Sequence, residues 1–220
     1  ESSPDGCRRL AVIDTLQALD EAVALRDRVE RELAIIDRKD FPGYFIIVHD
    51  IVAFAREQDW RIAMVLETHA HADHLSAAPF IKAHTGAWIG IGAHIRDVQK
   101  IFRPVFAMDD LKTDGSDFDR LFENGDQFAI GALAVEVLHV PGHTPADVTY
   151  LIGDAAFVGD TLFMPDYGTA RCDFPGGDAA TLYRSIRRLL SLPPHTRLFM
   201  CHDYKAPGRD RYAWETTVAA

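Results

Sequence analysis

The sequence predicts a single α/β (α+β) domain, and three observations support this fold class. The chain has 220 residues, which is enough for one well-buried core and short for two full domains. Short apolar runs rich in Val and Ile recur along it, and runs of this kind form buried strands. Amphipathic segments that start at Asp or end near Pro separate several of these runs, as helices between strands do.

The first forty residues are the least regular part of the predicted fold. Apolar residues recur there at near-helical spacing among charged ones, at Leu16, Leu19, Val23, Val29 and Leu33. This spacing predicts an amphipathic helix, or a helix followed by a strand at 33–36. We therefore treat residues 1–40 as an atypical N-terminal segment of the domain 1–220.

The rest of the chain alternates between predicted strands and helices. The apolar run 44–48 predicts a strand, and Asp50 is expected to cap a helix that continues to Gln58. Further strands are expected at 62–66, 87–91, 128–130, 133–138, 148–152, 155–158 and 197–200, and further helices at 75–83, 95–102 and 179–190. The pair Gly153-Asp154 predicts a hairpin, and the polar segment 109–119 predicts a surface loop.

The loop Thr68-His69-Ala70-His71-Ala72-Asp73-His74 carries three imidazoles and a carboxylate. It follows the predicted strand 62–66, so it lies at the carboxyl end of a strand, where open α/β sheets bind their ligands. Imidazole and carboxylate groups are ligands for zinc, iron or manganese. One histidine in such a loop is ordinarily a solvated residue, but three with an acid predict a metal site.

Three later positions place another metal-ligating side chain directly after an apolar run. His143 follows the predicted strand 133–138, Asp160 follows 155–158, and His202 follows 197–200. We expect these strand ends to bring the three side chains to the loop that carries His69.

The order His69-X-His71-X-Asp73-His74, continued by the three later ligands, resembles the signature of the metallo-β-lactamase superfamily. The resemblance covers roughly residues 60–206. It implies an αββα four-layer sandwich with the metal in a cleft at one edge of two sheets. It also implies a β-hairpin at the N-terminus, in place of the helix that the residues of this segment predict.

The ligand types leave two kinds of metal centre open. His69, His143 and Asp160 provide two imidazoles and one carboxylate, the set of mononuclear non-haem iron oxygenases, which predicts one Fe(II) per chain. If His71, Asp73, His74 and His202 also take part, the site is that of a hydrolase with one or two zinc ions. Asp160 bridges the metals when two are bound.

The stretch from Asp160 to Lys205 resembles the persulfide dioxygenases, closest to the bacterial β-lactamase-related sulfur dioxygenases. The shared features are Arg171-Cys172-Asp173-Phe174 and His202-Asp203-Tyr204. The chain after His202 is also too short for the helical C-terminal domain of hydroxyacylglutathione hydrolases (glyoxalase II). We therefore expect the dioxygenase branch.

This branch implies an iron-dependent dioxygenase that oxidises glutathione persulfide with O2 to sulfite and glutathione, in sulfide detoxification. The alternative is a zinc-dependent hydroxyacylglutathione (glyoxalase II-like) thioester or lactone hydrolase. A third hypothesis is a metal-binding or sulfur-sensing protein without catalytic activity.

The resemblance also suggests roles for the polar residues around the metal. Catalysis and proton transfer are expected of Asp73, His74 and His202, and these residues with His71 form the set that orients the ligands or holds a second metal. Glutathione is anionic, so its binding requires a local cationic patch. The candidates for this patch are Arg171, Lys205 and Arg209, with Tyr167 and Tyr204 beside them.

The charge balance restricts the partners. The chain has 23 Lys plus Arg against 33 Asp plus Glu, a formal net charge of -10, which disfavours nucleic acid. No apolar stretch reaches the roughly 20 residues of a membrane helix, and residues 1–6 do not resemble a signal peptide. We expect a cytoplasmic protein that acts on a small molecule and O2, and a homodimer is the assembly to test.

Overall fold

The structure is a computed structural model that describes residues 42–70 and 76–220. The predictions for residues 1–40, and those for His71, Asp73 and His74, lie outside the described residues. The chain divides into two compact units, one containing residues up to Ala63 together with Ala83–Gly86, the other Met64–Lys82 and Ala87–Ala220. Both sheets belong to the second unit. No helix in the described ranges is long and apolar enough to cross a membrane.

A single helix, α3 (Pro42–Glu57), replaces the strand and the shorter helix that the sequence predicts in this region. The strand prediction at 44–48 and the cap at Asp50 are therefore wrong. A short apolar run does not distinguish a buried strand from a helix, because too few residues are present to define a period.

The first sheet contains three parallel strands, β1 (Met64–Leu66), β2 (Trp88–Gly92) and β3 (Arg120–Phe122), in that order. The helices α4 (Ala78–Thr85) and α5 (Ile95–Val105) follow β1 and β2 in the chain, as crossover connections between parallel strands require. The predicted strands and helices are confirmed here. The strand β3 was not foreseen, because three residues after a polar loop give no alternation to recognise.

The second sheet contains six strands in the order β4-β5-β6-β7-β8-β9. Their bounds are β4 (Gln127–Ile130), β5 (Leu133–His139), β6 (Val148–Ile152), β7 (Ala155–Gly159), β8 (Arg197–Met200) and β9 (Glu215–Thr217). All neighbours are antiparallel except β7 and β8, which are parallel and joined through α6 (Ala179–Leu189). The hairpin at Gly153-Asp154 is confirmed, and Asp178 caps α6 by accepting the N–H of Thr181.

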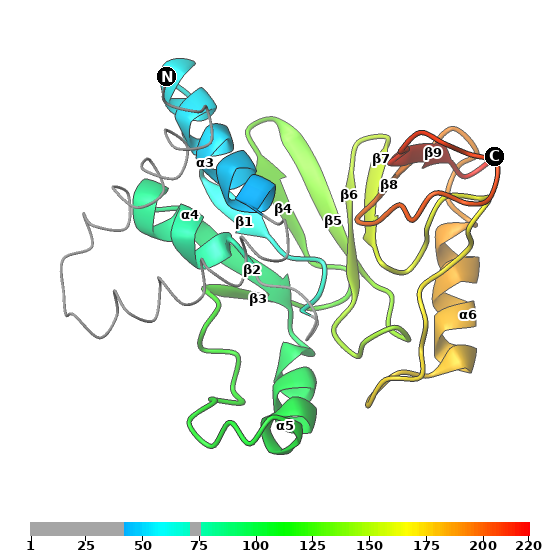
Figure 1. The fold of residues 1–220 in the computed structure, drawn as a ribbon, viewed down its shortest axis with the longest axis horizontal. Coiled ribbons are helices and arrows are strands. Elements are labelled where there is room, and N and C mark those ends of the chain that lie inside the picture. The colour runs from blue at the N-terminus through cyan, green and yellow to red at the C-terminus, as the bar shows by residue number, and fades with distance from the viewer. Residues whose placement is uncertain (1–41, 71–75) are drawn as a thin grey trace, which may run out of the picture. The chain divides into compact units, whose positions relative to one another are not determined.

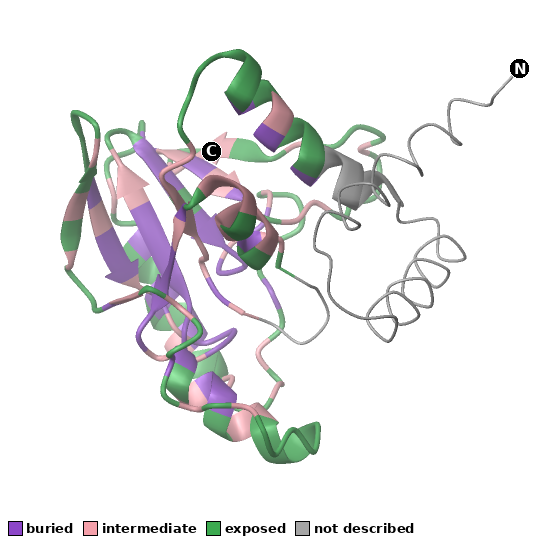
Figure 2. Ribbon diagram, turned by 90° about the vertical axis from the view of Figure 1, so that its left-hand side faces the viewer, coloured by how far each residue is buried: buried purple, intermediate pink, exposed green. Residues whose placement is uncertain are grey.

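Three buried clusters show how these elements stack in the second unit. One lies between the two sheets and combines Phe122 of β3 with strands β5 and β6. A second packs Leu189 of α6 against β5, β7 and β8, and a third packs α5 against Ile91 of β2. Figure 1 locates these elements and Figure 2 shows the buried residues along the strands. The order helix, sheet, sheet, helix confirms the predicted αββα sandwich.

Arg120 at the start of β3 packs on the aromatic rings of the cluster between the sheets. Its guanidinium carbon lies 4.6 Å from the ring centroid of Phe122, 5.1 Å from that of Phe128 and 6.0 Å from that of Trp88. A guanidinium at these distances is attracted to the faces of aromatic rings.

We expect Arg120→Met to lower the free energy of unfolding by about 1 kcal/mol, because it keeps an apolar stem and removes the cation. Arg120→Lys should retain most of that stability. Urea unfolding of the three proteins checks this prediction. A methionine variant as stable as the wild type would show that the charge contributes nothing.

Candidate metal centre

Three loops, each after a strand, carry the predicted ligands. His69 follows β1, His143 follows β5, and Asp160 directly follows β7. The loop after β1 is held against β6, because Val148 donates its N–H to the carbonyl of Thr68 at 2.9 Å. This hydrogen bond therefore joins the loop after the first sheet to the second sheet, directly before His69.

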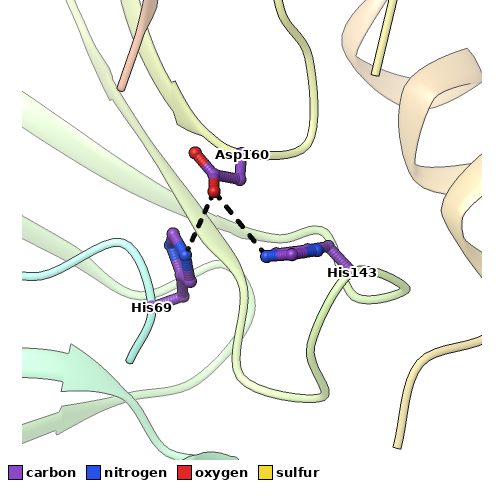
Figure 3. A group of neighbouring side chains, drawn as sticks. All are labelled: His69, His143 and Asp160. Carbon is purple, nitrogen blue, oxygen red and sulfur yellow. Dashed lines mark ion pairs between the residues drawn. The ribbon is translucent and has the colours of Figure 1, made fainter. Parts of the chain in front are cut away.

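The structure brings His69, His143 and Asp160 together (Figure 3). One ligand atom from each lies within 4.8 Å of the other two. Asp160 Oδ2 lies 3.5 Å from His69 Nε2 and 3.7 Å from His143 Nε2. All three residues are buried, with 6%, 3% and 5% of their surface exposed.

Backbone contacts fix the ring of His143. Its Nδ1 lies 2.7 Å from the carbonyl oxygen of Arg171, so this nitrogen carries the proton and donates it. The other nitrogen, Nε2, then presents a lone pair toward Asp160. Metal-ligating histidines are commonly oriented in this way by a carbonyl behind the ring.

The donor set fits a divalent transition metal. Two imidazoles and a carboxylate converge, and Asp160 Oδ1 is buried with no hydrogen-bond partner in the described part of the chain. Burial by itself works to lower the pKa of His69, but the carboxylates of Asp160 and Asp147 outweigh it and raise that pKa. Burial works to raise the pKa of Asp160, yet its interactions with His69, His202 and His143 together outweigh burial and lower that pKa. The negative charge of the site therefore attracts a cation.

His202 reaches the same carboxylate from the solvent side. Its Nε2 lies 3.5 Å from Asp160 Oδ2, and its side chain is 36% exposed. The rings of Tyr204 and Phe163 lie 5.7 Å and 6.3 Å from its ring. His202 therefore lies at the partly exposed side of Asp160, and its catalytic role stays a prediction, as do the roles of His71, Asp73 and His74.

The predicted substrate-binding residues lie around His202 and His143. Tyr167 and Tyr204 stack with centroids 5.2 Å apart, and both are exposed. The Lys205 ammonium lies 4.4 Å from the ring centroid of Tyr212. Arg171 donates two hydrogen bonds to Asp173, at 2.6 Å and 2.7 Å. The surface here is aromatic, and one of its cations is already paired with an acid.

Arg209 has a structural role that the sequence did not indicate. Its guanidinium donates to both oxygens of Asp203 and to both oxygens of Asp166. It therefore ties the loop after Asp160 to the loop that carries His202. Two carboxylates neutralise its charge, which leaves less attraction for an anionic ligand than the sequence suggested.

The hydrogen bonds from Arg209 hold the pKa of Asp203 well below its usual range. A folded-state pKa below the unfolded value of about 3.9 means that folding favours the carboxylate form. The stability that this carboxylate contributes is fully present at neutral pH. It is lost as the pH falls from the unfolded-state pKa of about 3.9 through the lower folded-state pKa.

We therefore expect Asp203→Asn to lower the unfolding midpoint at pH 7, and the difference from the wild type to shrink below about pH 4. Thermal unfolding of both proteins at pH 7, 5 and 3 measures it. A difference that stays constant across this range would contradict the assigned ion pair.

Two further residues behind His69 were missed as parts of the site. Thr68 Oγ1 lies 3.2 Å from His69 Nδ1, and Asp147 Oδ1 lies 3.8 Å from the same nitrogen. Burial raises the pKa of Asp147 to about 7. The sequence signal for Asp147 was an acid four residues after His143, which fits a turn residue equally well.

Known proteins share this sequence pattern and fold. The profile of the metallo-beta-lactamase superfamily matches residues 5–202. A probable metallo-hydrolase of Burkholderia pseudomallei is 58% identical over 170 residues, which make up 72% of this chain and 58% of that protein. The chain therefore spans less than two thirds of the length of this relative.

Solved structures give the same picture. ETHE1 from Myxococcus xanthus matches with a TM-score of 0.63 and 31% identity, over 78% of this chain and 65% of that one. A protein solved in a di-iron-bound form matches with a TM-score of 0.56 and 26% identity, over 77% of this chain and 79% of that one.

Proposed function

Because this chain belongs to the metallo-beta-lactamase superfamily, we propose that it is an iron-dependent dioxygenase that oxidises glutathione persulfide. The observation that carries the proposal is the buried set of His69, His143 and Asp160. Two imidazoles and one carboxylate leave coordination positions of an Fe(II) ion open to small molecules. The matches to ETHE1 and to a di-iron protein, and the resemblance to the persulfide dioxygenase branch, support this choice of reaction and metal.

The proposed reaction consumes one persulfide, one O2 and one water, and it yields sulfite, glutathione and two protons. The terminal sulfur is oxidised, O2 is reduced, and the sulfur–sulfur bond breaks. His69, His143 and Asp160 would hold the iron, which would supply the redox chemistry and a common binding point for both reactants.

The residues of the chain provide the surroundings for this chemistry. His202 lies 3.5 Å from Asp160 and is partly exposed, so it is the group that accepts or donates a proton at the open side of the site. The stacked rings of Tyr167 and Tyr204 form a wall beside it, on which the apolar part of a glutathione moiety packs. Lys205 and Arg171 are cations close in sequence to these two rings. We assign them to the binding of the glutathione carboxylates.

The second candidate is a zinc-dependent hydrolase of glutathione thioesters or lactones. The observation that favours it is the position of His202, which adds a third imidazole at 3.5 Å from the shared carboxylate, as a two-metal site requires. The Burkholderia relative is itself called a probable metallo-hydrolase.

An oxygen electrode separates the two candidates. Protein loaded anaerobically with Fe(II) should consume O2 when glutathione persulfide is added, and sulfite should accumulate in equal amount. The same protein should leave a hydroxyacylglutathione thioester uncleaved. Rapid thioester cleavage by the zinc-loaded protein, without O2 uptake by the iron-loaded protein, would replace the dioxygenase by the hydrolase. Bound metal without either reaction would favour the role without catalysis.

A further inference from the structure

We infer that Asp147 is a positioning residue that holds the ring of His69 with its Nε2 toward the metal. The inference rests on the metal centre of the proposed function, which the dioxygenase and the hydrolase share. It does not depend on which of the two reactions takes place.

The loop after β5 fixes the carboxylate of Asp147 in place. Asp147 is 2% exposed, and its Oδ2 accepts the backbone N–H of Thr144 at 2.5 Å. Its own carbonyl accepts the N–H of Val140 at 2.9 Å. Thr144 directly follows the ligand His143, so the carboxylate also ties down the turn that presents this second ligand.

The other oxygen of Asp147 faces His69. Oδ1 is buried and has no hydrogen-bond partner among residues 42–70 and 76–220, and it lies 3.8 Å from His69 Nδ1. In the same part of the chain, His69 is the one basic side chain that forms an ion pair with Asp147. A buried carboxylate favours a neighbour that presents a proton to it.

This arrangement decides which nitrogen of His69 carries the proton. The negative charge of Asp147 favours the form protonated at Nδ1, with the hydroxyl of Thr68 beside it at 3.2 Å. The lone pair then lies on Nε2, which faces Asp160 at 3.5 Å. A carboxylate behind a ligating imidazole also increases its basicity, and loss of such a partner typically weakens metal binding by about 10- to 100-fold.

The substitution Asp147→Asn tests the charge with little change in shape. The amide oxygen of Asn can still accept the N–H of Thr144. Its NH2 group then faces His69 Nδ1 and donates to it, which favours the proton on Nε2 and removes the lone pair from the metal side. Thr68→Val is the second variant, because it removes the other group near Nδ1.

Asp126→Asn is the matched control. Asp126 Oδ2 accepts the backbone N–H of Glu123, three positions earlier in the chain, at 2.9 Å. Asp147 makes the same contact with Thr144, which is also three positions earlier. Asp126 lies at the turn before β4, away from the ligands in sequence. Its substitution therefore reports the cost of changing this contact alone.

The readouts are the Zn2+ dissociation constant, measured by competition with a chromogenic chelator at pH 8, the visible spectrum of the Co2+ form, and the unfolding midpoint of the metal-free protein. For Asp147→Asn we expect Zn2+ binding weakened by about 10- to 100-fold and a changed Co2+ spectrum. The metal-free midpoint should be equal to or above that of the wild type, because a buried charge is removed. Asp126→Asn should bind Zn2+ as the wild type does.

Three results would overturn the inference. One is an Asp147→Asn variant that binds Zn2+ within twofold of the wild type. Another is a metal-free midpoint that falls together with the affinity, because the role would then be purely structural. The third is a full loss of affinity in Thr68→Val with none in Asp147→Asn. A wild-type chain that binds no metal would instead overturn the metal centre itself, and this inference with it.

Discussion

The Asp160→Asn variant is expected to bind less than a tenth as much iron per chain as the wild type, and to lose O2 uptake with glutathione persulfide by more than about 100-fold. One oxygen of Asp160 lies within 3.7 Å of a ring nitrogen of His69, His143 and His202. In the described part of the chain, Asp160 is the residue whose carboxylate pairs with all three rings. Asn has almost the same shape but carries no charge, so the loss reports the carboxylate itself.

Iron content by mass spectrometry and the oxygen electrode measure this effect. Asp154→Asn is the control. Asp154 is an exposed carboxylate in the hairpin between β6 and β7, and it pairs with Arg197 of β8. This variant should keep both the iron content and the activity of the wild type. An Asp160→Asn protein that retains bound iron and turnover would remove this residue from the centre.

Gly142→Ala is expected to lower the free energy of unfolding by about 3 to 5 kcal/mol and to weaken metal binding. A Cβ at this position would lie 2.3 Å from the backbone nitrogen and 2.4 Å from the Cα of Leu182 in α6. Its φ of +135° is also a backbone conformation that favours glycine. The helix backbone is part of a buried layer, so the loop would have to move and take the adjacent ligand His143 with it.

Gly153→Ala separates the two causes. Gly153 also has a positive φ, at +61°, but nothing lies within 4 Å of an added Cβ. We expect it to cost about 1 to 2 kcal/mol from backbone strain alone, and to leave metal affinity unchanged. Urea unfolding of the metal-free proteins compares them. Equal losses in the two variants would show that the contact with α6 is unimportant.

The fold was predictable where local sequence and burial agree. The runs that became β2, β5, β6 and β7 are apolar, rich in β-branched residues and bounded by turn residues, so their strand character does not depend on distant contacts. The ligands were predictable for the same reason, because His69, His143 and Asp160 each follow such a run. The structure adds that these strand ends meet.

Other features depend on tertiary contacts that no local pattern encodes. The run 44–48 is apolar enough for a strand, yet it lies inside α3. The strands β3 and β9 have three residues each, and pairing with longer neighbours defines them. The sequence suggested that Arg209 is a ligand-binding cation. In the structure it forms ion pairs with two acids from separate loops, Asp166 and Asp203. The position of Asp147 behind His69 likewise comes from the folding of one loop over another.

Anomalous diffraction at the iron absorption edge, from crystals of the iron-loaded protein, tests the central claim most directly. We predict one strong peak about 2.0 to 2.2 Å from His69 Nε2, His143 Nε2 and the nearer oxygen of Asp160. A peak elsewhere on the chain, or an iron-loaded crystal without a peak between these three side chains, would contradict the proposed metal centre.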